Sequence, residues 1–136
     1  MAIKLLDTTF LIHYWAGSEN VEAYLERHEE ESEFVTTTIN VKEIAVGRAL
    51  QDAFDRNEIR SQFGWVSLVP FRVEHAFIAG ELEAELHRDE TVNRDRINSL
   101  AGDLLIGAVA KQLGATVVTQ NTDDFDRLDG VDVETY

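Results

Sequence analysis

Five short runs of apolar and β-branched residues alternate along the chain with segments of helical periodicity, and this alternation is the strongest constraint on the fold. Strands separated by helices form a parallel sheet, and right-handed crossovers then place helices on both of its faces. The sequence therefore predicts an α/β fold built as a three-layer α/β/α sandwich, in one domain that spans residues 1–136. The predicted strands are Ile3–Leu6, Phe34–Thr37, Trp65–Val69, Ala115–Thr119 and Val131–Glu134.

The helical segments carry recognisable start and stop signals. Ser18 precedes a segment with acids in its first turn, and Thr38 or Asn40 can cap the helix after the second strand. Gly114 ends the most apolar helix at a C′ position, where glycine is favoured. The polar stretch Asp89–Asn98 is predicted as a loop or a helix entry. The predicted helices are Thr8–Trp15, a segment from Ser18, one helix or a pair reaching Phe63, Val73–His87, Leu104–Leu113 and a short helix within Asn121–Leu128.

The charge balance limits the classes of partner. Twenty-six Asp and Glu residues oppose twelve Lys and Arg, which gives a net charge of -14, and the only lysines are Lys4, Lys42 and Lys111. A free-standing nucleic-acid binder normally shows a basic surface, which this composition argues against. An acidic, lysine-poor surface favours a high-salt cytoplasm such as that of a halophilic archaeon, where salt screens self-repulsion. Most of the acids are then expected on the solvated surface.

Cysteine usage and hydropathy indicate a compartment. The chain has no cysteine, which excludes disulfides and thiolate metal sites and is compatible with a reducing environment. No apolar stretch approaches the ~20 residues of a membrane span, and no basic segment with a cleavage site precedes the first strand. A cytoplasmic protein without membrane association is expected.

Four acidic positions follow or face the carboxyl ends of the predicted strands, where ligands of open parallel sheets bind. Asp7 ends the first strand, Glu43 lies in the helix after the second, and Asp103 stands at the head of the apolar helix. Asp124, with Asp123 beside it, follows the fourth strand. Crowded carboxylates repel one another, and a bound divalent cation removes that penalty. Oxygen ligands without cysteine or clustered histidine favour Mg²⁺ or Mn²⁺ over Zn²⁺.

Each acid also has a structural interpretation when taken alone. Asp7 can cap the helix that follows it, and Glu43 and Asp103 can stabilise a helix through its dipole. The pair Asp123-Asp124 is typical of an Asx turn. The four histidines are scattered and are expected at surface or helix positions: His13, His28, His75 and His87.

Two further groups of residues have competing interpretations. Arg94 and Arg96 precede Asp103 and could meet a substrate phosphate, although pairing with Asp89, Glu90 or Asp95 is favoured. The aromatic and apolar residues of the first helix are expected to pack in the core, and the alternative is a groove for a partner peptide or a dimer contact: Phe10, Leu11, Tyr14 and Trp15.

Four motifs in order carry a family resemblance. They are D-T-T-F-L-I from Asp7, N-x-x-E from Asn40, D-L-L-I-G-A from Asp103 and V-V-T-x-N-T-x-D-F from Val117. Together they resemble a PIN domain, and most closely the VapC-type toxin ribonucleases of prokaryotic toxin–antitoxin pairs. The resemblance covers Ile3 to Glu134. It implies a five-stranded parallel sheet in the order 3-2-1-4-5.

The resemblance also implies an activity. VapC-type proteins are Mg²⁺- or Mn²⁺-dependent endoribonucleases, which implies an RNA substrate, a cognate VapB-like antitoxin and a homodimer. The implied catalytic residues are Asp7, Glu43, Asp103 and Asp124, with Asp7, Asp103 and Asp124 as metal ligands. Aligning the D-F pair assigns the fourth acid to Asp124, with Asp123 as its possible substitute. The implied substrate-contacting or supporting residues are Thr8, Thr9, Asn121 and Asp123.

Three other functions compete with this one. A receiver domain also places acids at strand ends and binds Mg²⁺, but it requires an acceptor Asp after the third strand, where Val69-Pro70-Phe71 stands, and a lysine after the fifth. A PIN-fold partner without activity would not need all four acids. A PIN-fold nuclease that processes RNA or DNA outside a toxin–antitoxin pair would carry the same residues.

Overall fold

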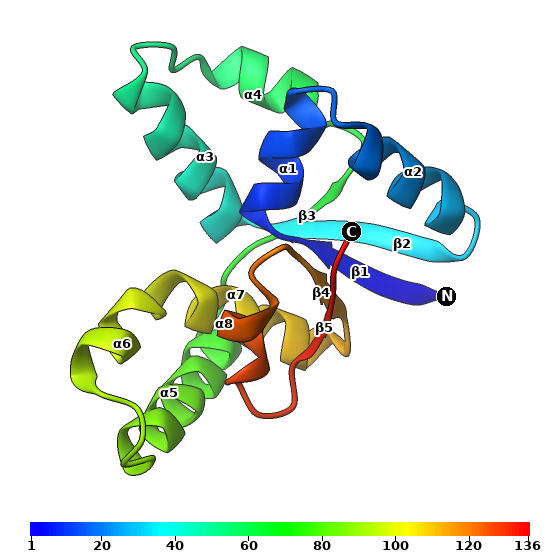
Figure 1. Ribbon diagram of the computed structural model, residues 1–136. Helices are drawn as coiled ribbons and strands as arrows, with labels where there is room; N and C mark the ends of the chain where they lie inside the picture. Colours follow the sequence, from blue (N-terminus) through cyan, green and yellow to red (C-terminus); the bar gives the residue numbers. More distant parts are fainter.

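The computed structural model describes residues 1–136 and contains one five-stranded sheet (Figure 1). All pairings are parallel, and the order is β3-β2-β1-β4-β5. The predicted fold class and strand order are therefore confirmed. The order differs from the 2-1-3-4-5 arrangement of receiver-like sheets, which argues against that alternative. The strands are β1 Ala2–Leu6, β2 Ser32–Thr37, β3 Ser67–Val69, β4 Thr116–Val118 and β5 Asp132–Glu134.

Helices cover both faces of the sheet, as Figure 1 shows. Helices α1 to α4 lie on one face, and α5 to α8 lie on the other. None of them combines the length and the apolar character that a bilayer span requires. The helices are α1 Thr8–Trp15, α2 Glu19–His28, α3 Thr38–Leu50, α4 Arg56–Gln62, α5 Val73–Arg88, α6 Arg94–Ser99, α7 Ala101–Leu113 and α8 Thr122–Asp126.

The two central strands bury side chains on both faces, because successive side chains of a strand alternate. Leu5 of β1 and Val117 of β4 belong to the core beneath α5 and α7, whereas Leu6 and Val118 belong to the core beneath α1 to α4. All four are fully buried. This double burial fixes the register of β1 beside β4, and hence the positions of the residues that follow them.

Several boundaries differ from the sequence prediction in an informative way. Thr37, not Thr38 or Asn40, caps α3, because its side chain accepts a hydrogen bond from the Asn40 N–H while Asn40 bonds back to the Thr37 N–H. Helix α7 begins at Ala101, so Asp103 lies in its first turn. The segment after the second strand forms a pair of helices, as one of the two predicted arrangements. The polar stretch after α5 contains the short helix α6, capped by Asn93.

The third strand begins at Ser67 rather than Trp65, because Trp65 and Val66 still belong to the turn that follows α4. There the Val66 N–H donates to the Phe63 carbonyl, and the Trp65 indole N–H donates to the Gln62 carbonyl. His75 is buried rather than exposed. Its ring nitrogens bond the Arg72 N–H and the Gln112 side chain, so it has a structural role at the start of α5.

Candidate active site

The site begins at the point where the strand order reverses. Strands β1 and β4 are neighbours whose crossovers lead to opposite faces of the sheet, and ligands of such folds bind at this switch point. Asp7 directly follows β1 and is only 3% exposed. It occupies the N-cap position of α1, yet its carboxylate makes no capping hydrogen bond. Instead, Oδ2 accepts a hydrogen bond of 2.8 Å from the hydroxyl of Thr119, the residue after β4.

Asn40 connects Asp7 to the next acidic residue. The capping box with Thr37 holds Asn40, which is fully buried. Its amide nitrogen donates to Asp7 Oδ1 at 3.3 Å and to Thr8 Oγ1 at 3.0 Å. Thr8 in turn donates to Glu43 Oε1 at 2.5 Å. A continuous chain of hydrogen bonds therefore runs from the end of β1 to the first turns of α3.

Helix α7 approaches Glu43 through a glycine. A Cβ added to Gly102 would lie 2.8 Å from Glu43 Oε2, so only glycine leaves room for this carboxylate as it stands. The next residue is Asp103. Burial, followed by repulsion from Asp7, Asp124 and Glu43, raises the pKa of Asp103 to about 7. The four acids predicted from the sequence are thus close enough to influence one another electrostatically.

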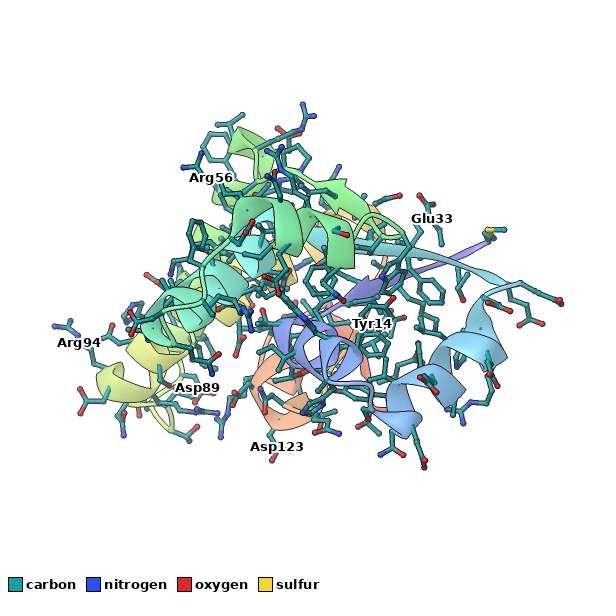
Figure 2. The ribbon with its side chains drawn as sticks, turned by 90° about the horizontal axis from the view of Figure 1, so that it is seen from above. Tyr14, Glu33, Arg56, Asp89, Arg94 and Asp123 are labelled. Carbon is teal, nitrogen blue, oxygen red and sulfur yellow. The ribbon has the colours of Figure 1, made fainter.

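Asp124 reaches this cluster from α8 and is ion-paired with Arg96 of α6. The prediction that Arg96 pairs with its sequence neighbours is therefore wrong, because α6 packs against the start of α7 and directs Arg96 across to α8. Asn93 supports this placement by accepting a hydrogen bond of 2.8 Å from the Arg96 N–H. The guanidinium opposes the rise in the pKa of Asp103. Arg94, by contrast, points outward (Figure 2).

The other predicted supporting residues lie less centrally. Thr8 takes part in the hydrogen-bond chain, while the hydroxyl of Thr9 is buried without a hydrogen bond. Asn121 is exposed, and only its backbone N–H joins the site, through Thr119 Oγ1. Asp123 is exposed and points outward (Figure 2).

Sequence reasoning missed Thr119, Gly102 and the supporting role of Asn40. The available signals were a hydroxyl directly after an apolar strand, a glycine directly before a candidate acid, and an Asn three residues after a Thr at a helix start. Each of these patterns is common, so only the spatial arrangement makes them informative.

The electrostatics of the cluster suit a cation. Burial raises the pKa of Asp7 more strongly than its hydrogen bonds from Thr119, Thr8 and Asn40 lower it. A positive ion would lower the pKa of both Asp7 and Asp103. The side chains as placed bring no three acidic or histidine groups to ligating distance of one point. Mg²⁺ typically takes one or two carboxylates and retains several waters, so the oxygen-only donor set of Asp7, Asp103 and Asp124 fits this ion.

The sequence of residues 4–131 matches the PIN domain family. The chain is a PIN domain protein. PIN domains are nucleases that generally use divalent metal ions. No curated protein matches this sequence.

Solved structures share the fold over nearly the full length. The VapBC structure from Salmonella typhimurium bound to DNA matches with a TM-score of 0.79 and 23% identity, covering 99% of this chain and 98% of that chain. VapBC2 from Rickettsia felis, bound to a promoter DNA fragment, matches with a TM-score of 0.78 and 21% identity, with 98% of each chain covered. FitAcB from Neisseria gonorrhoeae matches with a TM-score of 0.68 and 27% identity, covering 96% of this chain and 95% of that chain. This PIN domain therefore has the architecture found in VapBC toxin–antitoxin complexes.

Proposed function

We propose that this PIN domain is the toxin of a VapBC-type toxin–antitoxin pair and cleaves RNA internally with the help of Mg²⁺ or Mn²⁺. The observation that carries the proposal is the convergence of acids at the carboxyl edge of the sheet: a chain of hydrogen bonds joins Asp7 to Glu43, and Gly102, the residue before Asp103, lies against the Glu43 carboxylate. Acids scattered over the surface would not bring their carboxylates close to one another. A crowded, partly buried group of carboxylates is the arrangement that a phosphodiester-cleaving metal centre requires.

The residues divide into ligands and supporting groups. Asp7 and Asp103 would hold the ion directly, and Asp124 would complete the set directly or through water. When bound, the ion lowers the pKa of water and offsets charge on the phosphate. Glu43, oriented by Thr8, accepts the proton of the attacking water. Asn40 and Thr119 keep the Asp7 carboxylate in one orientation through their two hydrogen bonds.

Arg96 has a separate role in this proposal. It is the cation paired with Asp124, so it offsets negative charge before a metal ion binds. With Asp124 engaged in metal binding, the guanidinium would be available to a substrate phosphate, for which its planar fork of donors is suited.

An antitoxin partner is supported by two observations. Two of the solved structures that share the fold are VapBC structures bound to DNA. The net charge of -14 favours a partner segment that carries basic residues. A short upstream reading frame with a DNA-binding N-terminus would support this assignment over RNA or DNA processing outside a toxin–antitoxin pair. The composition supports a high-salt cytoplasm as the working environment.

We also propose a homodimer. Large apolar side chains are exposed at the edge strand β3 and at the start of α5, where Leu68 is 54%, Val73 67% and Phe77 71% exposed. Exposed apolar groups concentrated in one stretch often mark an interface. Light scattering of the wild type and of Phe77→Glu tests this, with a dimer expected for the first and a monomer for the second. A monomeric wild type would contradict it.

The function is tested with purified protein, defined RNAs and DNAs of the same sequence, each with Mn²⁺ or with EDTA. We expect internal cleavage of RNA in Mn²⁺ only, and cleavage that persists when the sugar at the cut site is 2′-deoxy, because water and not the 2′-hydroxyl attacks. The Asp7→Asn protein should fold and not cleave. Cleavage in EDTA, or cleavage of DNA alone, would refute the proposal.

A further inference from the structure

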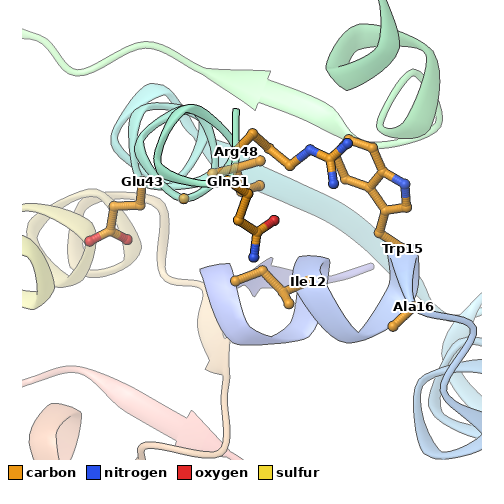
Figure 3. A pocket seen from close by; sticks show the side chains of 8 residues that line it. Ile12, Trp15, Ala16, Glu43, Arg48 and Gln51 are labelled. Carbon is orange, nitrogen blue, oxygen red and sulfur yellow. The ribbon is translucent and has the colours of Figure 1, made fainter. Parts of the chain in front are cut away.

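A pocket of about 270 Å³ lies between α1 and α3, beside the acidic cluster (Figure 3). We propose that it binds one nucleobase of the RNA substrate, next to the phosphate that is cleaved. The inference rests on the proposed function, to which it adds a base-binding subsite. The residues that carry it are Ile12, Trp15, Ile44, Gly47, Arg48 and Gln51.

Glu43 connects the pocket to the cluster. It lines the pocket, and its carboxylate accepts the hydrogen bond from Thr8 and faces Gly102 of α7. In Figure 3 the carboxylate points away from Arg48, in the last turn of α3, and from Gln51, the C-cap residue of that helix. A strand whose phosphate lies at the cluster would therefore pass the mouth of the pocket with its adjacent base.

The walls of the pocket have the chemistry that a base requires. Ile12 and Ile44 supply apolar surface, and the Gln51 amide, which extends toward Ile12 in Figure 3, can donate to and accept from a base edge. The Arg48 guanidinium carbon lies 4.3 Å from the centroid of the Trp15 ring, in a cation–π contact. Single-stranded RNA is commonly read by stacking bases on aromatic rings or guanidinium planes and by bonding their edges.

The size of the pocket favours a single ring system. Pockets for drug-sized ligands occupy about 300–1,000 Å³, and this one lies just below that range. A helix from a partner protein is about 10 Å across and would need a longer groove. The Nε of Arg48 is buried without a hydrogen-bond partner, which leaves a donor inside the protein that a ligand or ordered water can satisfy.

Charge gives an independent reason for a base subsite. Affinity for RNA usually comes from phosphate contacts with Lys and Arg, but this chain has a net charge of -14. Arg48, the arginine that lines the pocket, is already paired with Glu58 at 3.2 Å. Contacts to a base must then supply a large share of the free energy of RNA binding. Stacking of a base on a side chain is insensitive to the charge of the protein surface.

Gly47 allows the pocket to be closed without disturbing the fold. A Cβ at this position meets nothing within 4 Å, and Gly47 lines the pocket, so Gly47→Leu would extend into the space that we assign to the base. Leucine also has a higher helix propensity than glycine. Gly80→Leu is the matched control, because Gly80 lies in α5, likewise has open space around its Cβ and is no part of the pocket.

The experiment measures binding of four labelled ribo-homooctamers and of an abasic ribose octamer by fluorescence anisotropy, without divalent ions. We expect the wild type and Gly80→Leu to bind at least one homooctamer about 5- to 150-fold more tightly than the abasic octamer. Gly47→Leu should lose that difference and retain the weak abasic binding. Equal binding of all octamers by the wild type, or an unchanged difference in Gly47→Leu, would overturn the proposal.

Two further outcomes are informative. If Gly47→Leu keeps its preference for bases and loses affinity for the antitoxin, the pocket belongs to the protein partner and the proposal is overturned. Cleavage in Mn²⁺ is measured separately on the same proteins. A wild type that binds bases through this pocket and never cleaves refutes the nuclease function without refuting the subsite.

Discussion

Replacing Asp103 with asparagine should stabilise the metal-free protein at neutral pH while it abolishes cleavage. The pKa of Asp103 rises from its ordinary 3.8 to about 7, first because of burial and then because of Asp7, Asp124 and Glu43. The ionised carboxylate is therefore unfavourable in the folded state. Asparagine keeps the shape of the side chain and removes the charge, so the fold loses a source of repulsion.

The magnitude follows from the size of this shift. A rise of about three in the pKa of Asp103 corresponds to roughly 4 kcal/mol of added cost for the ionised form in the folded state, at about 1.4 kcal/mol per pKa unit. Solvent still reaches the side chain of Asp103 and screens the repulsion, so we expect about 1–2 kcal/mol. For a chain of 136 residues this raises Tm by roughly 3–10 °C.

The sign of the pH dependence is fixed by the direction of the shift. Below about pH 4 the Asp103 carboxyl is protonated in both the folded and the unfolded chain, so the wild type and Asp103→Asn should be equally stable. As the pH rises toward 7, the unfolded chain loses this proton more readily than the folded chain, and the stability of the wild type falls relative to the variant. The difference should be complete above about pH 7.

The assay is thermal unfolding from pH 4 to 8 at fixed KCl, in EDTA and in Mg²⁺. Mg²⁺ should raise the Tm of the wild type more than that of Asp103→Asn, because a ligand stabilises the state that binds it. Asp123→Asn removes a charge from an exposed neighbour of the cluster and serves as the control. A variant no more stable than the wild type at pH 8 in EDTA, or a gain that persists unchanged at pH 4, would refute the reasoning.

Three other perturbations test separate parts of the site. Arg96→Gln should tighten Mn²⁺ binding several-fold in calorimetry, because it removes the cation that competes for Asp124. The control Arg94→Gln should leave Mn²⁺ affinity unchanged, and weaker Mn²⁺ binding by Arg96→Gln would contradict this role. Gly102→Ala should keep the fold and lower the cleavage rate about tenfold, because the added Cβ displaces the Glu43 carboxylate. The control Gly80→Ala should cleave normally, and full activity in Gly102→Ala would argue against a role for the Glu43 carboxylate. Cleavage should persist at about 1 M KCl, where the Debye length is about 3 Å, and activity confined to low salt would contradict adaptation to a high-salt cytoplasm.

The sheet could be predicted from the sequence because its central strands are buried on both faces. Short runs rich in apolar residues, such as Ile3–Leu6 with Lys4 as its single polar member, are typical of parallel strands, and helix signals between them exclude hairpins. The position of Asp7 then followed, because a residue directly after a central parallel strand lies at the carboxyl edge of the sheet. The strand order itself came from the family resemblance and not from periodicity.

The interactions around the acids could not be predicted in the same way. The pairing of Arg96 with Asp124 depends on how α6 packs against α7, and local sequence favoured nearer acids. The contact between Gly102 and Glu43 joins residues on two helices. Thr119 contacts Asp7 because β4 lies beside β1, a pairing of strands far apart in the chain. Such side-chain contacts depend on rotamers and helix orientations, which hydrophobic patterning leaves open.

The most direct test of the acidic centre compares RNA cleavage in Mn²⁺ by single variants of neighbouring acids. Asp7→Asn, Glu43→Gln, Asp103→Asn and Asp124→Asn should each lose at least about a hundredfold in kcat/KM, roughly 2.7 kcal/mol of transition-state stabilisation. Asp123→Asn, which alters the exposed acid next to Asp124, should cleave like the wild type. Full cleavage by Asp7→Asn or Asp103→Asn, or an equal loss in Asp123→Asn, would contradict the assignment of these four carboxylates to a metal-dependent nuclease centre.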